Sequence, residues 1–243
     1  MSRYNSSIGL LKWSLIRHKF YIPVFVIVQV VLSLAVIYGF SFITNAKDYI
    51  SRSFLCTGAI TINILAVTCV LAPQIVSEAK QNGVFNYQKT LPISRVGILL
   101  SDLLIWGLIP LPGILLCMFI GAINFDMKIY LDFIGVFSLL FVILSLLLLG
   151  FAIAYLLPPN VMTLITQVIM IVGLLFSPII YSEDRLPIWL SYVYNVLPFV
   201  PVSNIIRASL FHLNDYNMTH YLVVMVWGII SFVGAMFIIA RRK

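Results

Sequence analysis

The chain has 243 residues, of which 62% are hydrophobic and only 9% are charged. A soluble globular protein carries roughly 25% charged residues, so this composition excludes a water-soluble fold and indicates an integral membrane protein. The formal net charge is +7, but the Lys and Arg residues are spread between long apolar blocks, which argues against a nucleic-acid-binding face.

Six apolar stretches are long enough to cross a membrane as helices, for which about 20 mostly apolar residues are needed. They cover residues 20–44, 54–77, 96–123, 133–156, 161–181 and 216–240. The fourth and fifth belong to one uncharged stretch, which Pro158, Pro159 and Asn160 break because proline removes a helix donor. We therefore expect an all-α integral membrane protein with six transmembrane helices in one domain, residues 1–243.

Residues 1–19 precede the first span and mix basic with apolar side chains. Apolar positions recur at helical spacing, and Trp13 lies among them; they are Ile8, Leu11, Leu15 and Ile16. This pattern predicts an amphipathic interfacial helix on the inner leaflet, in contact with membrane lipid. The alternative is a basic flank that only fixes the topology.

One further uncharged stretch, Leu186–Ile206, is long enough to be counted as a seventh span. Pro187, Pro198 and Pro201 interrupt it, and irregular backbone is tolerated at membrane depth only where protein or a cavity shields it. We therefore predict a re-entrant helical hairpin on the outer side, within residues 183–207, before the last span.

Positive charge is divided unequally between the two sides that six spans create. One side carries five Lys and Arg, including Arg207, and the other carries ten, which are Arg3, Lys12, Arg17, Lys19, Lys80, Lys89, Arg95, Arg241, Arg242 and Lys243. Cytoplasmic loops carry the excess of Lys and Arg. We therefore expect both termini in the cytoplasm and a multi-pass protein of the cell membrane, specifically a bacterial plasma membrane.

Motifs for catalysis are absent from the sequence. It contains no G-x-x-x-x-G-K-[ST] phosphate loop, no H-E-x-x-H and no G-x-S-x-G. Cys56, Cys69 and Cys117 lie in apolar runs without C-x-x-C spacing, and the three histidines are far apart. We expect no catalytic residue, metal or cofactor in this chain, so any ATP, with its Mg²⁺, must be handled by another chain.

Polar side chains inside the spans are few, and no ionisable residue lies at mid-span. Asp102 is about two turns inside the third span, where a structural role is favoured over a proton relay. Uncharged polar residues in spans either hydrogen-bond neighbouring helices or line a substrate path. The candidates for the path are Asn63, Thr68, Thr163 and Gln167, of which the last two share one helix face.

The loop between the second and third spans, residues 78–95, carries a recognisable pattern. An acidic residue ends the span, a central glycine follows, and a Pro-x-Ser-Arg exit closes the loop: Glu78, Gly83, Pro92, Ser94 and Arg95. This order resembles the cytoplasmic coupling loop of type-2 ABC transporter permeases. The chain departs from that pattern at Asn86, where the family commonly has an acidic residue, and at Lys80 and Gln81, which replace a charged pair.

A second resemblance to the same family follows the fifth span. A Ser-Pro-x-x-Tyr turn, a Leu-Pro-x-Trp segment, a proline corner and an arginine come in the family's order: Ser177 to Tyr181, Leu186 to Trp189, Pro198 and Arg207. Together the two matches cover the chain from the second to the sixth span.

The resemblance implies the permease of an ATP-driven exporter, a dimer of six-span halves with two cytosolic ABC ATPase subunits. It implies that the loop and the N-terminal helix bind the ATPase, and that the second and fifth spans line the substrate route between the two permease halves. The residues expected at the ATPase are Glu78, Lys80, Gly83, Val84, Phe85, Tyr87, Pro92, Arg95 and Trp13. The outer gate is expected at Pro178, Tyr181, Pro187 and Pro198. In the alternative, the loop is a solvated connector.

The apolar spans favour an amphiphilic cargo, such as a drug, an antimicrobial peptide or a lipid-like molecule. A polysaccharide or haem exporter is a second interpretation within the same family. Outside this family, the alternatives are an ion-coupled secondary transporter or channel and an intramembrane enzyme. The partner half is either a second copy of this chain or a related one.

Overall fold

The computed structural model describes residues 9, 15–16, 18–44, 48–84, 95–173, 177–181, 187–213 and 215–241, and all regular structure in these ranges is helical. The helices are α2 (Tyr21–Leu34), α3 (Phe40–Thr44), α4 (Tyr49–Leu65), α5 (Ala72–Gln81), α7 (Arg95–Leu108), α8 (Leu111–Phe125), α9 (Phe133–Leu156), α10 (Pro159–Ile171), α11 (Ile188–Val196), α12 (Phe199–Phe211) and α13 (Met218–Arg241). Two π-helical turns, η1 (Ala35–Gly39) and η2 (Ala66–Leu71), join α2 to α3 and α4 to α5.

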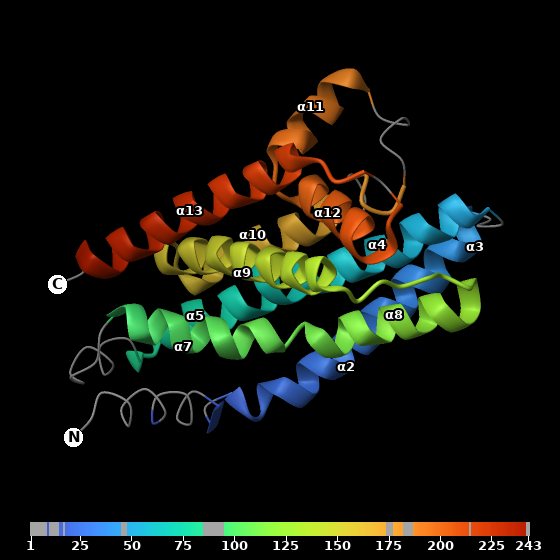
Figure 1. Ribbon diagram of the computed structural model, residues 1–243. Coiled ribbons are helices and arrows are strands. Elements are labelled where there is room, and N and C mark those ends of the chain that lie inside the picture. The colour runs from blue at the N-terminus through green and yellow to red at the C-terminus, as the bar shows by residue number, and fades with distance from the viewer. Residues whose placement is uncertain are drawn as a thin grey trace.

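The helices form a bundle with two ends (Figure 1). At one end, called here the basal end, α2 begins, α5 ends, α7 begins and α13 ends. At the opposite, distal end α3 and α8 end and α4 and α9 begin. The first four predicted spans therefore run in alternating directions, as a chain that crosses a membrane repeatedly must.

Five helical segments are long and apolar enough to cross a membrane: Tyr21–Phe42, Tyr49–Gln81, Leu99–Phe125, Phe133–Leu156 and Met218–Ile238. They confirm the all-α membrane fold and the approximate places of five of the six predicted spans. The second span is longer than predicted at both ends, because the helix continues past Arg52 and Glu78, whose charges bounded the apolar stretch.

The predicted fifth span, residues 161–181, is only partly a regular helix. α10 has 13 residues, about 20 Å of helix, whereas the hydrocarbon core of a bilayer is about 30 Å thick. Val172 and Gly173 continue it as a π-helical turn, and residues 177–181 form turns and bends around Pro178. Apolar composition predicted the place of the helix, and among the described residues of this stretch the regular α-helix extends to Ile171.

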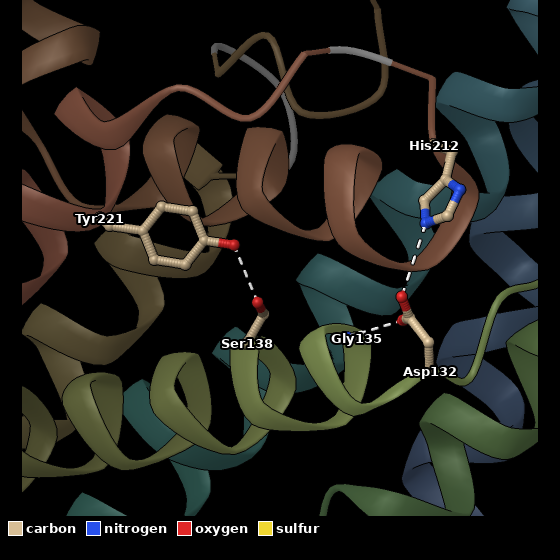
Figure 2. Close-up of polar contacts among 5 residues, drawn as sticks. All are labelled: Asp132, Gly135, Ser138, His212 and Tyr221. Carbon is tan, nitrogen blue, oxygen red and sulfur yellow. Dashed lines mark hydrogen bonds and ion pairs between the residues drawn. The ribbon is translucent and has the colours of Figure 1, made fainter.

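α9 and α13 run in the same direction. Ser138 on α9 and Tyr221 on α13 share a hydrogen bond of 2.8 Å between their hydroxyls (Figure 2). Seven residues later on both helices, a Cβ built on Gly228 would lie 3.3 Å from Ser145 Oγ. The chain between these helices therefore returns once from the basal to the distal end, which is the path predicted for the fifth span.

Two short helices, α11 and α12, occupy the segment for which the sequence predicts a helical hairpin. They meet at Pro198. α12 packs among α4, α9 and α13 with most of its side chains buried, whereas α11 exposes Trp189 (67%) and Tyr192 (72%). Such amphipathic rings suit the boundary between membrane and water.

The second span forms the centre of the bundle. In its most apolar window 83% of residues are buried, compared with 28% in the first span and 22% in the last. It packs against α2, α8, α9, α10 and α12. The outer helices thus present apolar side chains outward around a central helix that is covered by its own chain.

Candidate functional site

The start of α2 and the end of α5 enclose an open pocket at the basal end. Its volume is about 140 Å³, and its lining residues are His18, Tyr21, Ile75, Glu78, Ala79, Asn82 and Val84. The four lining positions from 75 to 82 follow the spacing i, i+3, i+4, i+7, so they form one stripe on the helix. The structure therefore brings together the two segments that the sequence assigned to ATPase contact.

A turn at Gly83 ends α5. The N–H groups of Asn82 and Gly83 donate to the carbonyls of Glu78 (3.0 Å) and Lys80 (3.3 Å), and Gly83 has a φ of +78°, in the left-handed region that glycine adopts readily. No atom lies within 4 Å of a Cβ built on Gly83. Within this chain, the backbone conformation of the turn is therefore what requires the glycine.

Lys80 points away from the pocket, toward α9. Its ammonium donates to the carbonyl oxygens of Ala154, Tyr155 and Leu157 at 3.4, 2.7 and 3.1 Å. Ser77, one turn earlier, donates through its hydroxyl to the Leu157 carbonyl at 3.2 Å. The sequence placed Lys80 at the ATPase contact, whereas the structure places it on the C-terminal end of α9.

Four residues predicted for the ATPase contact, Trp13, Phe85, Tyr87 and Pro92, lie outside the described residues, and Arg95 begins α7. Within the predicted interfacial helix, Leu15 and Ile16 are helical and exposed. His18 is buried, and its ring meets that of Trp106 edge-on with centroids 5.0 Å apart. This contact fixes the start of the first span against α7.

The four residues predicted to line a substrate path do not lie together. Asn63 and Thr68 are fully buried: Asn63 Nδ2 donates to Ser33 Oγ at 3.0 Å, and Thr68 Oγ1 donates to a carbonyl of its own helix at 2.7 Å. Thr163 and Gln167 are exposed on α10. Of the four, only the α10 pair offers polar groups to a surface of the chain.

The third predicted span, 96–123, is broken at Pro110 into α7 and α8. In a continuous helix the Gly113 N–H would donate to the Ile109 carbonyl. Instead the Gln29 amide stands between them: its Nε2 donates to the Ile109 carbonyl at 2.8 Å, and Gly113 N donates to its Oε1 at 2.8 Å. A Cβ on Gly113 would lie 2.5 Å from that oxygen. The predicted third span is therefore made of two helices, which a side chain of the first span joins.

Arg207, which the sequence analysis counted among the charges of the outer side, is buried inside the bundle. It is 2% exposed on α12. Its guanidinium donates to Thr57 Oγ1 at 3.2 Å, to Asn204 Oδ1 at 2.8 Å and to the Ile179 carbonyl. In the sequence, a single arginine between apolar residues was interpreted as a topology signal. In the structure, hydrogen-bond acceptors on α4, on α12 and in the turn after α10 compensate for the cost of burying its charge.

The residues predicted at the outer gate occupy different environments. Pro178 and Pro198 are buried, Tyr181 is half-buried and Pro187 is exposed. Pro187 and Pro198 stand immediately before α11 and α12. The structure therefore shows these two prolines setting the starts of the two short helices.

A polar cluster at the distal end joins α9 to the end of α12 (Figure 2). Asp132 Oδ1 accepts from Gly135 N at 2.9 Å and caps α9, while Oδ2 lies 4.0 Å from His212 Nε2. His212 has a φ of +49°, and its ring stacks on Tyr130 with centroids 4.1 Å apart. No pattern in the sequence pointed to this cluster, because its members come from separate connections between helices.

Among the residues that the structure describes, no group of three or more His, Cys, Asp or Glu is placed to hold a metal ion. Asp102, for which the sequence favours a structural role, is 2% exposed on α7.

The comparison with known families agrees with this architecture. The family model described as ABC-2 type transporter matches residues 11–211, which is most of the chain. No curated protein matches the chain. The match runs from the segment before α2 through α12 and includes the pocket, the Lys80 contacts and the Arg207 cluster. The chain belongs to the ABC-2 type transporter family, as a transport permease, and residues 11–211 are its membrane domain.

Proposed function

We propose that this permease is one half of an ATP-driven exporter and that its ATPase subunit docks at the basal pocket. The observation that carries the proposal is the pocket, where the start of α2 meets the end of α5. ABC-2 permeases pair with an ABC ATPase subunit. Apolar Ile75 and Val84 beside the exposed carboxylate of Glu78 give this surface both apolar area and a charge for a protein partner.

Docking is tested by co-purification of the permease with its ATPase. Val84→Asp places a charge in the apolar part of the interface, and an unpaired charge buried on binding adds a desolvation penalty to the lost contact. We expect the recovered ATPase to fall about tenfold or more. Leu131→Asp, the same charge on an exposed residue of the distal connection between α8 and α9, serves as the control. Phe85→Asp tests the sequence-based contact in the same assay.

An unchanged yield of ATPase with Val84→Asp would contradict docking at the pocket. If Phe85→Asp alone detached the ATPase, the contact would lie on the loop after the pocket. If neither variant detached it, the remaining candidate is the N-terminal segment around Trp13.

We further propose six membrane crossings with the basal end in the cytoplasm. The excess of Lys and Arg at that end and the shared direction of α9 and α13 support this topology. A cysteine introduced at Lys128 should react with an impermeant thiol reagent in intact cells. A cysteine introduced at Gln81 should react only after the cells are lysed. The native Cys56, Cys69 and Cys117 are buried and give little background. Labelling of position 81 in intact cells would overturn the orientation.

The cargo is proposed to be amphiphilic and to pass along the outward face of α10, where a second permease half completes the route. That face exposes Leu164 (64%) and Val168 (58%) beside the polar Thr163 and Gln167. Apolar area with a few polar groups is the usual lining of a site for such molecules. A second copy of this chain or a related half would supply the facing wall.

A panel of amphiphilic drugs, peptides and lipids, added to the permease–ATPase complex in vesicles, tests the cargo class. We expect members of the panel to stimulate ATP hydrolysis at least about twofold, with Gln167→Leu shifting the half-maximal concentration. Stimulation by haem or oligosaccharide alone would favour those exporters instead. Transport driven by an ion gradient without ATP would indicate a secondary transporter.

A further inference from the structure

We infer that Lys80 is a positioning residue that ties the ATPase-facing end of α5 to the turn between α9 and α10, so that movement at the pocket reaches α10. The inference rests on the proposed docking at the pocket. It assigns to Lys80 an inward, transmitting role in place of the direct ATPase contact that its sequence position predicts.

The acceptors of Lys80 are carbonyls that proline has deprived of their helical donors. In an α-helix the carbonyls of Ala154 and Tyr155 would accept from the N–H groups of residues 158 and 159. Both positions are proline, which has no N–H. Lys80 Nζ lies 3.4 and 2.7 Å from these two oxygens and thus replaces both missing donors.

Two further interactions strengthen the same junction. The Leu157 carbonyl accepts from Lys80 Nζ at 3.1 Å and from Ser77 Oγ at 3.2 Å. A positive charge also interacts favourably with the negative end of the α9 dipole. Because charge-assisted hydrogen bonds are stronger than neutral ones, the end of α5 and the α9–α10 turn should move together.

α5 carries its two sets of contacts on opposite faces. Successive residues are 100° apart around a helix, so Pro73, Ser77 and Lys80 form one stripe. The stripe that lines the pocket, centred on Glu78 and Ala79, lies on the opposite side. A displacement of α5 caused by a partner in the pocket is therefore directed toward the α9–α10 turn on its opposite face.

α10 is also linked to α5 directly. Gln74 Nε2 donates to Thr166 Oγ1 at 2.6 Å, one turn of helix before the Ser77 contact. The turn at Leu157 and Pro158 leads straight into α10, whose outward face carries Thr163 and Gln167. α10 is thus held to α5 at its start and at its middle, and Lys80 makes the charged contact.

The test uses the permease purified with its ATPase and a spin label on Gln167→Cys. Label mobility is compared without nucleotide and with ATP plus vanadate, so no cargo is needed. We expect Lys80→Met to retain the ATPase but to reduce the nucleotide-dependent change at position 167 about fivefold or more. Lys80→Arg, which restores charged donors, should recover most of it. Lys128→Met, the same substitution on the exposed distal connection, should behave like the unsubstituted chain.

Each result bears on one proposal. A Lys80→Met complex with an unchanged label response overturns the inference, and so does a Lys80→Met chain that loses the ATPase while Lys80→Arg binds it. If the unsubstituted complex binds ATPase but its label does not respond, transmission to α10 fails while docking stands. If no ATPase is recovered with the unsubstituted permease, the proposed docking fails. Should Lys80→Met not fold, Lys80→Gln and Ser77→Ala carry the same test, with intermediate losses expected.

Discussion

Gly150 on α9 lies so close to the backbone carbonyl of Thr68 in the second span that any Cβ at position 150 would overlap it. The same Cβ would lie 2.6 Å from Pro73 Cγ. Neither the π-helical turn that holds Thr68 nor the proline ring can move aside like a flexible side chain. The approach of α9 to the central span therefore requires glycine.

Gly150→Ala should destabilise the protein by about 1–3 kcal/mol, because an added methyl group forces the two helices apart. For a chain of this size that corresponds to a melting temperature lower by about 2–4 °C per kcal/mol, measured by thermal unfolding in detergent. Gly234→Ala is the control, since nothing lies within 4 Å of its Cβ and alanine favours a helix. Equal melting temperatures for the two variants would contradict the close packing.

Gln29→Leu should leave the Ile109 carbonyl and the Gly113 N–H without their partner in a buried site. Each such buried group costs about 1–3 kcal/mol, so the loss should exceed that of an ordinary substitution in a span. Thermal unfolding measures it against Gln167→Leu, which changes an exposed glutamine of α10. Equal melting temperatures for the two leucine variants would contradict the bridging role of Gln29.

Arg207→Met should release the turn that follows α10. The substitution removes the donors to the Ile179 carbonyl and to Asn204 while keeping an apolar stem of similar length. We expect a cysteine at Ser177, which is fully buried, to react about tenfold faster with a thiol reagent in this background. Arg52→Met, at the distal start of α4, provides the comparison. An unchanged labelling rate would show that Arg207 does not hold the turn.

Asp132 allows the helix cap and the ion pair to be separated. Asp132→Asn keeps an oxygen acceptor for the Gly135 N–H but removes the charge opposite His212, whereas Asp132→Ala removes both. An N-cap is worth about 1 kcal/mol, and an exposed ion pair at most about as much. We expect the alanine variant to lose about 1 kcal/mol in unfolding measurements and the asparagine variant to lose less than half of that. Equal losses would mean that the ion pair dominates.

Local properties of the sequence predicted the membrane fold well. Span length, proline breaks and the two short helices before α13 follow from hydropathy and backbone chemistry, which act within about 20 residues of chain. The same locality explains the errors. Charges at Arg52 and Glu78 bounded the predicted second span although the helix continues past them, and the stretch after Pro159 was predicted as one helix although the regular helix α10 ends at Ile171.

The polar contacts that organise the bundle could not be predicted in this way. The sequence does not indicate which groups Gln29, Lys80 and Arg207 contact. Their partners include backbone carbonyls and an amide 28 to 84 positions away in the chain, near breaks at Pro110, Pro158 and Pro178. Each break can be predicted from the local sequence, but the side chain that reaches it depends on how the helices pack. A shift of one position along a helix changes the direction of the side chain by 100° around the helix axis.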